Sequence, residues 1–238
     1  MFHRARKKRL FFDAQKYQVE KSGMWSSSKG EKNTEARRNE LLEKGFELFS
    51  TNSIEAISMR NVAGTVGCGS ASAYRYFGSK PDFVVAVAIW KWGQFQKENI
   101  KRRPEANFEG MTAAEIYEFT LDSFLVLYRN HRDLLRFNQF FNVYVQSENI
   151  DKGMLGPYRE MIGRFREGFH IMYVKAGQDK TIRTDEPEEE MFSKTIHLML
   201  AAVTRYAVGL VYIPENGFDA EKELKFQKNM LLKEYRNS

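Results

Sequence analysis

The chain of 238 residues is poor in the side chains that build disulfides, metal sites and membrane spans. Its single cysteine excludes an internal disulfide and is typical of a reducing compartment. The four histidines show no metal-ligand spacing such as HExxH, so we expect no metal and no cofactor. No run of about 18 uncharged apolar residues occurs, and the nearest one, residues 198–213, contains Arg205. The sequence therefore predicts a cytoplasmic protein without a membrane partner.

Signatures of catalysis are equally scarce. The Gly-Cys-Gly string at residues 67–69 lacks the following Lys and Ser/Thr of a phosphate-binding loop, and no strand is expected before it. Glu115, Glu118 and Asp122 fall on the face of a predicted helix, where carboxylates are usually solvated. We therefore expect that the protein is not an enzyme.

The positive charge of the chain is concentrated at its start. The formal net charge is +6, but residues 1–23 hold seven Lys/Arg and two Asp/Glu, which leaves 30 positive and 29 negative side chains for residues 24–238. Net charge is thus poor evidence for a nucleic-acid surface on the rest of the chain. We predict that residues 1–33 form a basic, disordered tail and linker. We favour this reading together with a natural start at Met24, which would make residues 1–23 upstream sequence; a basic arm along DNA phosphates is the alternative.

Residues 58–83 carry the signals for three helix starts and two tight turns. Ser58 is a good N-cap for a first helix, and Gly67 can take the left-handed conformation that ends it. The apolar stripe of this helix consists of Met59, Val62, Ala63 and Val66. Gly69 or Ser70 then caps a second helix, which Gly78 ends. Two short helices joined by a glycine-containing turn form a helix-turn-helix, which places its second helix in the DNA major groove.

The polar side chains of this segment suit DNA. With the core positions removed, the outward side of the second helix consists of Ser70, Ser72, Tyr74, Arg75 and Tyr76. Hydroxyl groups and a guanidinium bind phosphate oxygens and base edges. Ser79 caps a third helix with Pro81 in its first turn. Lys80 lies in that turn, where its ammonium and the free amides can hold an anion.

These strings resemble the N-terminal domain of TetR-type transcriptional regulators. The resemblance covers residues 34–87 and rests on a Ser-Met-Arg string at 58–60 and a Tyr-Arg-Tyr-Phe-Gly-Ser-Lys string at 74–80. It implies an all-helical homodimeric repressor whose larger C-terminal domain binds a small molecule and releases double-stranded DNA. It also implies DNA contacts at Ser58, Arg60, Ser72, Tyr74, Tyr76 and Lys80. Cys68, Gly69 and the Ala-Ser-Ala at 71–73 depart from the usual residues, so the base preference does not follow.

The resemblance and the helical pattern together predict an all-α fold with two domains. Residues 34–82 form a three-helix DNA-binding domain, and residues 83–238 form a helical bundle for ligand binding and dimerisation. In the connecting helix, from Lys80 to about Lys101, we expect Trp90 to be buried. Further helices are predicted over 111–129, 131–147, 157–177, 187–213 and 219–235.

The middle helices are rich in large aromatic residues and methionine. Such side chains serve a structural core equally well, but they also form an adaptable wall for a flat apolar ligand. The candidate ligand-binding residues are Phe124, Phe137, Phe141, Asn142, Phe169 and His170. A histidine at the last position is more often structural or exposed than a ligand contact.

The last two predicted helices are candidates for a dimer interface. Leu200 and Val203 belong to an apolar series on the first of them, and Leu231 and Leu232 to one on the second. Packing of these helices onto their own domain explains the pattern equally well. Two function classes remain: a ligand-responsive dimeric repressor, and an all-helical ligand-binding or protein-interaction module that does not bind DNA. Tyr74, Tyr76 and Lys80 favour the repressor.

Overall fold

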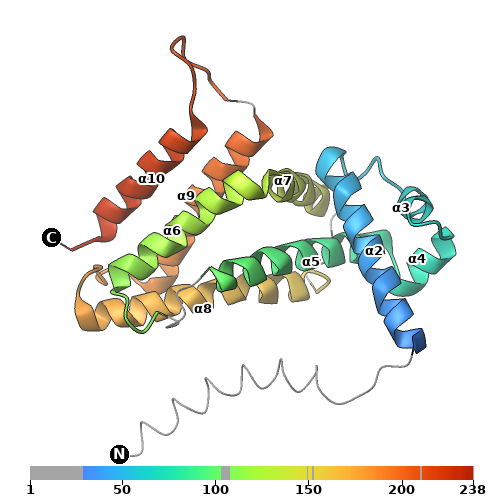
Figure 1. Ribbon diagram of the computed structural model, residues 1–238, viewed down its shortest axis with the longest axis horizontal. Coiled ribbons are helices and arrows are strands. Elements are labelled where there is room, and N and C mark those ends of the chain that lie inside the picture. The colour runs from blue at the N-terminus through green and yellow to red at the C-terminus, as the bar shows by residue number, and fades with distance from the viewer. Residues whose placement is uncertain (1–28, 103–107, 149, 152, 210, 238) are drawn as a thin grey trace, which may run out of the picture. The chain divides into compact units, whose positions relative to one another are not determined.

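The computed structural model describes residues 29–102, 108–148, 150–151, 153–209 and 211–237, with side chains from residue 33 onward. Over these residues the fold is all-α, as predicted, with one isolated bridge between Ile182 and Arg236 (Figure 1). The helices are α2 (Lys29–Thr51), α3 (Met59–Thr65), α4 (Ser70–Phe77), α5 (Lys80–Lys101), α6 (Ala113–Asn130), α7 (Arg132–Ser147), α8 (Gly156–Asp179), α9 (Glu188–Val208) and α10 (Ala220–Tyr235).

The start of the chain is described only in part. The predicted basic tail, residues 1–28, lies outside the described residues, whereas α2 begins at Lys29, inside the predicted linker. The contacts divide the chain after Asn39 into two units. The second unit, residues 40–238, contains both the helix-turn-helix and the bundle.

Local capping chemistry fixes α3 and its turn. The Ser58 hydroxyl accepts from the Asn61 amide, and the Asn61 side chain accepts in return from the Ser58 backbone N–H, which together make a capping box. The helix ends before Gly67, which adopts φ +68°. Because a residue without Cβ takes this conformation without strain, the chain turns into α4 here. The predicted Ser58 cap and the Gly67 turn are both confirmed.

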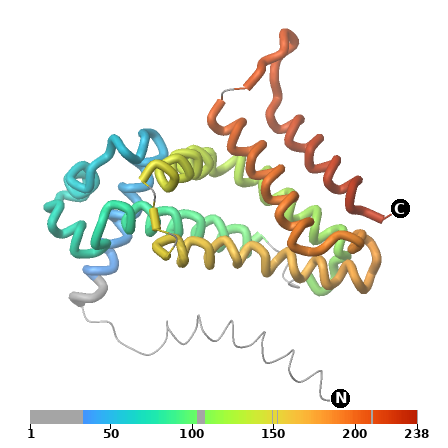
Figure 2. Tube along the Cα trace, turned by 180° about the vertical axis from the view of Figure 1, so that it is seen from behind, coloured from blue at the N-terminus to red at the C-terminus, as the bar shows by residue number. Residues whose placement is uncertain are grey.

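The start of α5 follows the same logic. The Ser79 hydroxyl accepts from the Asp82 amide, Pro81 lies in the first turn, and Gly78 takes φ +76° just before. The body of α5 then packs against α7 and α8. This helix therefore leads from the helix-turn-helix into the bundle, and Figure 2 shows the same path from behind.

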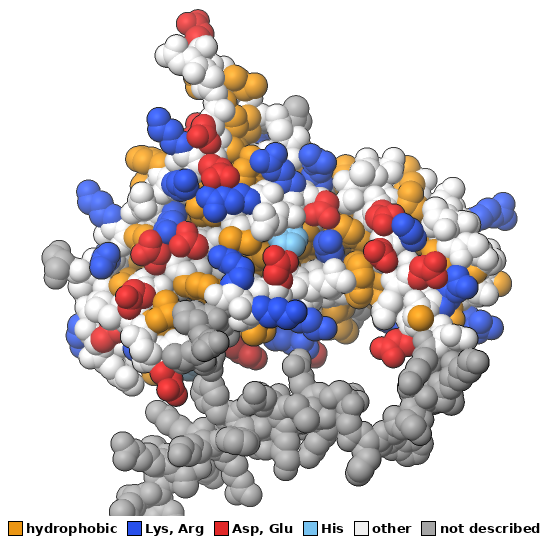
Figure 3. Space-filling view, in the orientation of Figure 1, with side chains coloured by type: hydrophobic (Ala, Val, Ile, Leu, Met, Phe, Trp, Pro, Cys, Tyr) orange, Lys and Arg blue, Asp and Glu red, His pale blue; other side chains and the backbone are white. Residues whose placement is uncertain are grey.

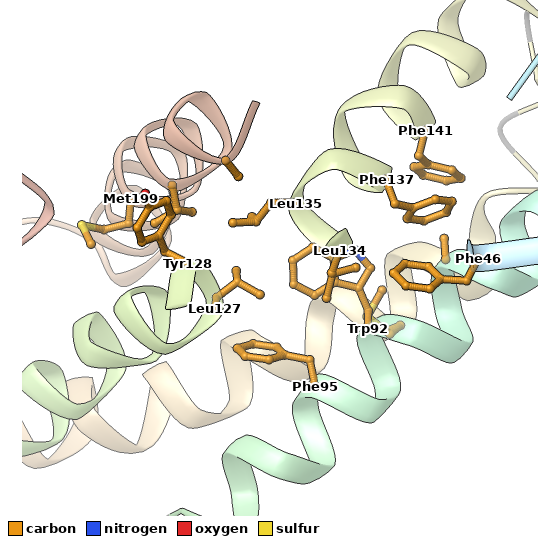
Figure 4. Packing of buried hydrophobic residues seen from close by; sticks show 14 of the residues in the cluster. Phe46, Trp92, Phe95, Leu127, Tyr128, Leu134, Leu135, Phe137, Phe141 and Met199 are labelled. Carbon is orange, nitrogen blue, oxygen red and sulfur yellow. The ribbon is translucent and has the colours of Figure 1, made fainter. Parts of the chain in front are cut away.

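Helices α6 to α10 pack against one another, with α6 in contact with α7, α8, α9 and α10. Both views show α10 beside α9, away from α3 and α4 (Figures 1 and 2). The core is continuous and rich in aromatic rings: Figure 4 shows Phe46, Phe137 and Phe141 grouped together, with Phe95 of α5 farther away, near Leu127.

Two sequence-based expectations about this bundle were wrong. Helix α9 was predicted to run to residue 213, but Gly209 adopts φ +87° and ends it at Val208. Trp90 was predicted to be buried on α5; it is only half-buried, and Trp92 takes the interior position with 4% exposed. Both residues lie near the apolar stripe, so the helical period alone did not separate them.

Candidate DNA-binding site

Helix α4 presents a mixed polar and aromatic surface. Ala73 and Phe77 are buried and hold the helix against the core. Tyr74 is 44% exposed and Arg75 is exposed, whereas Tyr76 is half-buried. The Arg75 guanidinium carbon lies 5.9 Å from the centre of the Tyr76 ring, so the two side chains lie together. One tyrosine and one arginine therefore reach solvent at the centre of this helix.

The remaining predicted DNA contacts lie at the helix starts. Ser70 and Ser72 are half-buried in the first turn of α4, and Arg60 is exposed in the first turn of α3. Ser58 is exposed, but its hydroxyl is engaged in the capping box, so a DNA contact there would share an oxygen that already accepts a hydrogen bond. These four residues all belong to the helix-turn-helix.

Lys80 has partners inside the chain. Its Nζ donates to the Glu55 carbonyl at 3.2 Å and lies 5.7 Å from the centre of the Tyr144 ring. Burial lowers the pKa of the Lys80 ammonium, because desolvation disfavours the charged form, while Glu148 and Glu55 oppose the shift. No sequence pattern indicated these contacts, since both partners are far from Lys80 along the chain.

Helix α7 contacts the same region at further points. The Ser147 hydroxyl donates to the Glu55 carboxylate at 3.1 Å. Nearer the start of α7, the centre of the Phe137 ring lies 5.5 Å from that of Phe46 on α2. We call α3, α4, the loop of residues 52–58 and Lys80 the reading head. Helix α7 thus contacts both the reading head and the interior of the bundle.

The structure does not gather the six candidate ligand residues. Phe137 and Phe141 stack at 5.9 Å on α7, while Phe169 on α8 packs against other rings. The neighbours of Phe169 are Tyr117 at 6.1 Å and Phe192 at 5.3 Å. Phe124 is half-buried on α6. The aromatic candidates therefore belong to at least two separate contact groups in one core.

The two polar candidates point elsewhere. Asn142 is exposed on α7. The His170 side chain is 60% exposed, and its Nδ1 lies 2.8 Å from the Glu188 carboxylate, so this histidine is a surface partner of a glutamate. Two ring nitrogens that do reach the interior belong to Trp92 and His131, which were not among the predicted site residues. In the sequence, the feature that could have indicated an interior place for these two residues is a position on or next to an apolar stripe.

An apolar groove runs between α9 and α10. It has a volume of about 650 Å³ and is lined by Leu198, Tyr206, Phe226, Met230 and neighbours. Leu198 is 50% exposed, Phe226 67% and Met230 56%. Val203 and Leu231 belong to the apolar series predicted for the dimer interface. Val203 is fully buried and Leu231 nearly so, because both pack within the chain. The exposed apolar side chains of these helices are thus not the predicted ones.

A second hollow beside the groove is charged. It has a volume of about 530 Å³ and is lined in part by Arg183, Lys194 and Glu186. Arg183 binds Asp185 at 2.8 Å, and Lys194 is paired with Glu186, so these cations have partners within the chain. Over the face drawn in Figure 3, basic and acidic side chains are intermixed. Among the described residues, no group of three His, Cys, Asp or Glu is placed to hold a metal ion. No described helix is long and apolar enough to cross a membrane.

The helical fold and the helix-turn-helix at its start define a class of DNA-binding regulators. Residues 41–87 match the model of bacterial regulatory proteins of the tetR family, which agrees with the resemblance found in the sequence. Regulators of this family are non-enzymatic DNA-binding proteins, in agreement with the expectation that the chain is not an enzyme. No curated protein sequence matches the chain significantly.

Solved structures share the fold over most of the chain. A putative TetR-family regulator from Vibrio parahaemolyticus has a TM-score of 0.62 at 12% identity, covering 85% of this chain and all of the other. FadR from Bacillus subtilis, solved with stearoyl-CoA, has a TM-score of 0.63 at 15% identity, covering 81% and 96%. The ketosteroid regulator KstR2 of Mycobacterium tuberculosis has a TM-score of 0.55 at 15% identity, covering 85% and 96%. At these identities the likeness is one of fold.

Proposed function

We propose that the protein is a homodimeric transcriptional repressor that a small apolar molecule releases from its operator. The observation that carries the proposal is the pairing of a capped helix-turn-helix with an exposed Tyr74 and Arg75 on its second helix. Residues 34–82 then serve as the DNA-binding domain and residues 83–238 as the ligand-binding and dimerisation domain. No cofactor takes part.

In the complex, α4 enters the major groove and its neighbours hold the backbone. Ser70, Ser72 and Tyr74 meet base edges or a thymine methyl group, since they lie on the outer side of α4. The phosphate contacts come from Ser58, Arg60, Arg75, Tyr76 and Lys80. Lys80 reaches a phosphate by exchanging its Glu55 carbonyl for a phosphate oxygen, which is a stronger acceptor because it is charged.

The dimer forms through the groove between α9 and α10. Contiguous exposed apolar side chains mark interaction surfaces, and Phe226 and Met230 on α10 lie beside Leu198 on α9. A two-fold interface here would pair the same surface of both copies. Each dimer would then carry two reading heads, which a palindromic operator with two half-sites matches.

Helix α7 supplies a route from effector to DNA. Phe137 belongs to the aromatic interior, while Tyr144 and Ser147, two to three turns later, contact Lys80 and Glu55. A ligand that displaces α7 would therefore shift the loop and the lysine that hold the reading head. The release requires that the effector bind the DNA-free arrangement more tightly, and operator DNA must then weaken the effector by the same factor.

A mobility-shift titration tests the proposal. The probe is the DNA upstream of the protein's own gene, and the variants are wild type and the double substitution Tyr74→Ala with Lys80→Ala. We expect a shifted complex for wild type that the double variant loses, with unchanged circular dichroism. Equal binding of the two proteins would mean that this helix-turn-helix is a structural hairpin and that the protein is a ligand-binding or interaction module.

A further inference from the structure

The buried indole of Trp92 lacks a hydrogen-bond partner. Trp92 is 4% exposed on α5, and no described residue accepts a hydrogen bond from its Nε1. An indole N–H is only a donor, so it cannot be satisfied by turning the ring over. Buried polar groups nearly always have a partner, and one that has none inside the chain calls for an acceptor from outside it.

The surroundings of Trp92 are aromatic and aliphatic. The Phe95 ring lies edge-on at 6.0 Å and the Phe165 ring of α8 at 5.8 Å. Helix α5, which carries Trp92, packs against α7 and α8, and Figure 4 shows Trp92 on α5 within this core. Rings from α5 and α8 therefore pack against the indole, and neither of them carries an oxygen.

His131 also packs against Phe95. Its ring centre is 5.3 Å from that of Phe95, and its Nε2 lies 3.0 Å from the Glu98 carboxylate. That contact is too poorly aligned to count as a hydrogen bond, so Nε2 also belongs to the buried nitrogens without one. The rings of Trp92 and His131 thus both pack against Phe95, and each has a buried nitrogen without a hydrogen bond.

The charges near this place favour an uncharged ligand. Glu98 lies at one edge, where it would repel an anion, and the nearby cation Lys91 is already paired with Asp133 at 3.4 Å. A carboxylate buried among the rings would need a free cation, because desolvation of an unpaired charge is costly. A neutral carbonyl oxygen accepts from an indole N–H without that cost.

We propose that Trp92 is the polar contact of the effector site, and that the effector is a flat apolar molecule with an uncharged carbonyl oxygen that accepts from Nε1. The rings of Phe95 and Phe165 then hold its apolar body. This assignment rests on the proposed function only in calling the ligand an effector. Ligand binding can be measured on the protein without DNA. The Trp92 site and the repressor function can therefore be refuted independently.

Equilibrium dialysis of three probes against the full-length protein tests the assignment. 2-Acetylnaphthalene carries the carbonyl, 2-isopropenylnaphthalene has the same shape without an acceptor, and 2-naphthoic acid carries a charge. Wild type should bind the ketone about tenfold more tightly than the alkene, the gain of one buried hydrogen bond. The acid should bind more weakly than the ketone. These comparisons need no variant, so a folding defect cannot obscure them.

Substitutions then locate the site. Trp92→Phe keeps a ring but removes the donor, so the ketone and the alkene should bind it equally. The matched control is Trp90→Phe on the same helix, where the half-buried Trp90 packs against Phe46 and the preference should persist. Equal binding of ketone and alkene by wild type, a preference that survives in Trp92→Phe, or no binding of any probe would each overturn the proposal. A failed operator shift with the predicted probe preference would overturn only the repressor function.

Discussion

The reading head and the α9–α10 face offer surfaces of opposite chemistry. On α4 the exposed side chains include Tyr74 and Arg75, which bring a hydroxyl and a guanidinium. On α10 the exposed side chains include Phe226 and Met230, which bring only apolar area. A polar surface loses little by remaining in water between encounters, whereas an apolar one gains by staying covered. Under the proposed function, the polar surface binds DNA reversibly, whereas the apolar face stays covered by a second copy of the chain.

A charge placed on the apolar face of α10 should have the largest effect. Phe226→Glu should give monomers, since a carboxylate would be buried without a partner. Operator affinity should then fall by about 10²–10⁴-fold, because two half-sites no longer act together. Analytical ultracentrifugation and a mobility-shift titration measure the two effects. The control Gln178→Glu adds the same charge at an exposed site on α8 and should leave both unchanged. A dimer that persists in Phe226→Glu would place the interface elsewhere.

The substitution Tyr74→Ala removes a polar side chain from the reading head instead of adding a charge to the apolar face. Tyr74→Ala should leave the protein dimeric and folded, because the ring is 44% exposed. A lost base contact costs on the order of 1–3 kcal/mol per half-site and relaxes preference at symmetric operator positions. Competition between operator variants in a binding assay measures both the cost and the preference. If Tyr74→Ala binds the operator more weakly but keeps the same base preference, Tyr74 contacts a phosphate and not a base.

The substitution Lys80→Ala distinguishes a contact with the DNA phosphates from a contact with the bases. Binding to all sequences should weaken alike, and the slope of log K against log salt should become less steep by about 0.9 for each subunit. Burial lowers the pKa of this ammonium, and the charges of Glu148 and Glu55 oppose that shift. Lys101→Ala, exposed at the last residue of α5, is the control and should change little. An unchanged salt slope would mean that Lys80 stays on Glu55 in the complex.

A smaller effect tests how α2 is held against α5. A Cβ added to Gly45 would lie 2.8 Å from Cε1 of the fully buried Phe83 and 3.3 Å from Val87. Gly45→Ala should therefore destabilise the fold by about 1–3 kcal/mol. Gly64→Ala meets nothing within 4 Å in α3 and should stabilise by about 0.5–1 kcal/mol. Urea denaturation measures both. A neutral Gly45→Ala would mean that α2 can move away from α5 at little cost.

How far the sequence predicted each region depends on the range of the interactions involved. The Ser58 cap, the Gly67 turn and the start of α5 at Ser79 were predictable, because each depends on residues within four positions. The partners of Lys80 were not, since Glu55 and Tyr144 come together only through the packing of α7. Local chemistry thus determined the helix-turn-helix but not its contacts with the bundle.

The bundle shows the same limit in its apolar helices. The period of α9 identified its apolar positions correctly, yet Val203 faces the chain's own core and Leu198 faces solvent. A helix with apolar residues on two sides does not reveal which side another copy covers. The sequence showed that the middle helices are rich in aromatic side chains. Only the three-dimensional packing showed that Trp92 lies in the interior and His170 at the surface.

Selection of bound DNA from a random pool tests whether the protein reads DNA as a dimer. Wild-type protein should enrich a single site with two-fold symmetry, whose half-sites are about one helical turn apart or a multiple of it. Phe226→Glu, selected in parallel, should enrich at most a single half-site. Enrichment of no sequence by the wild type, or of one asymmetric site by both proteins, would contradict a dimer that reads DNA through two copies of α4.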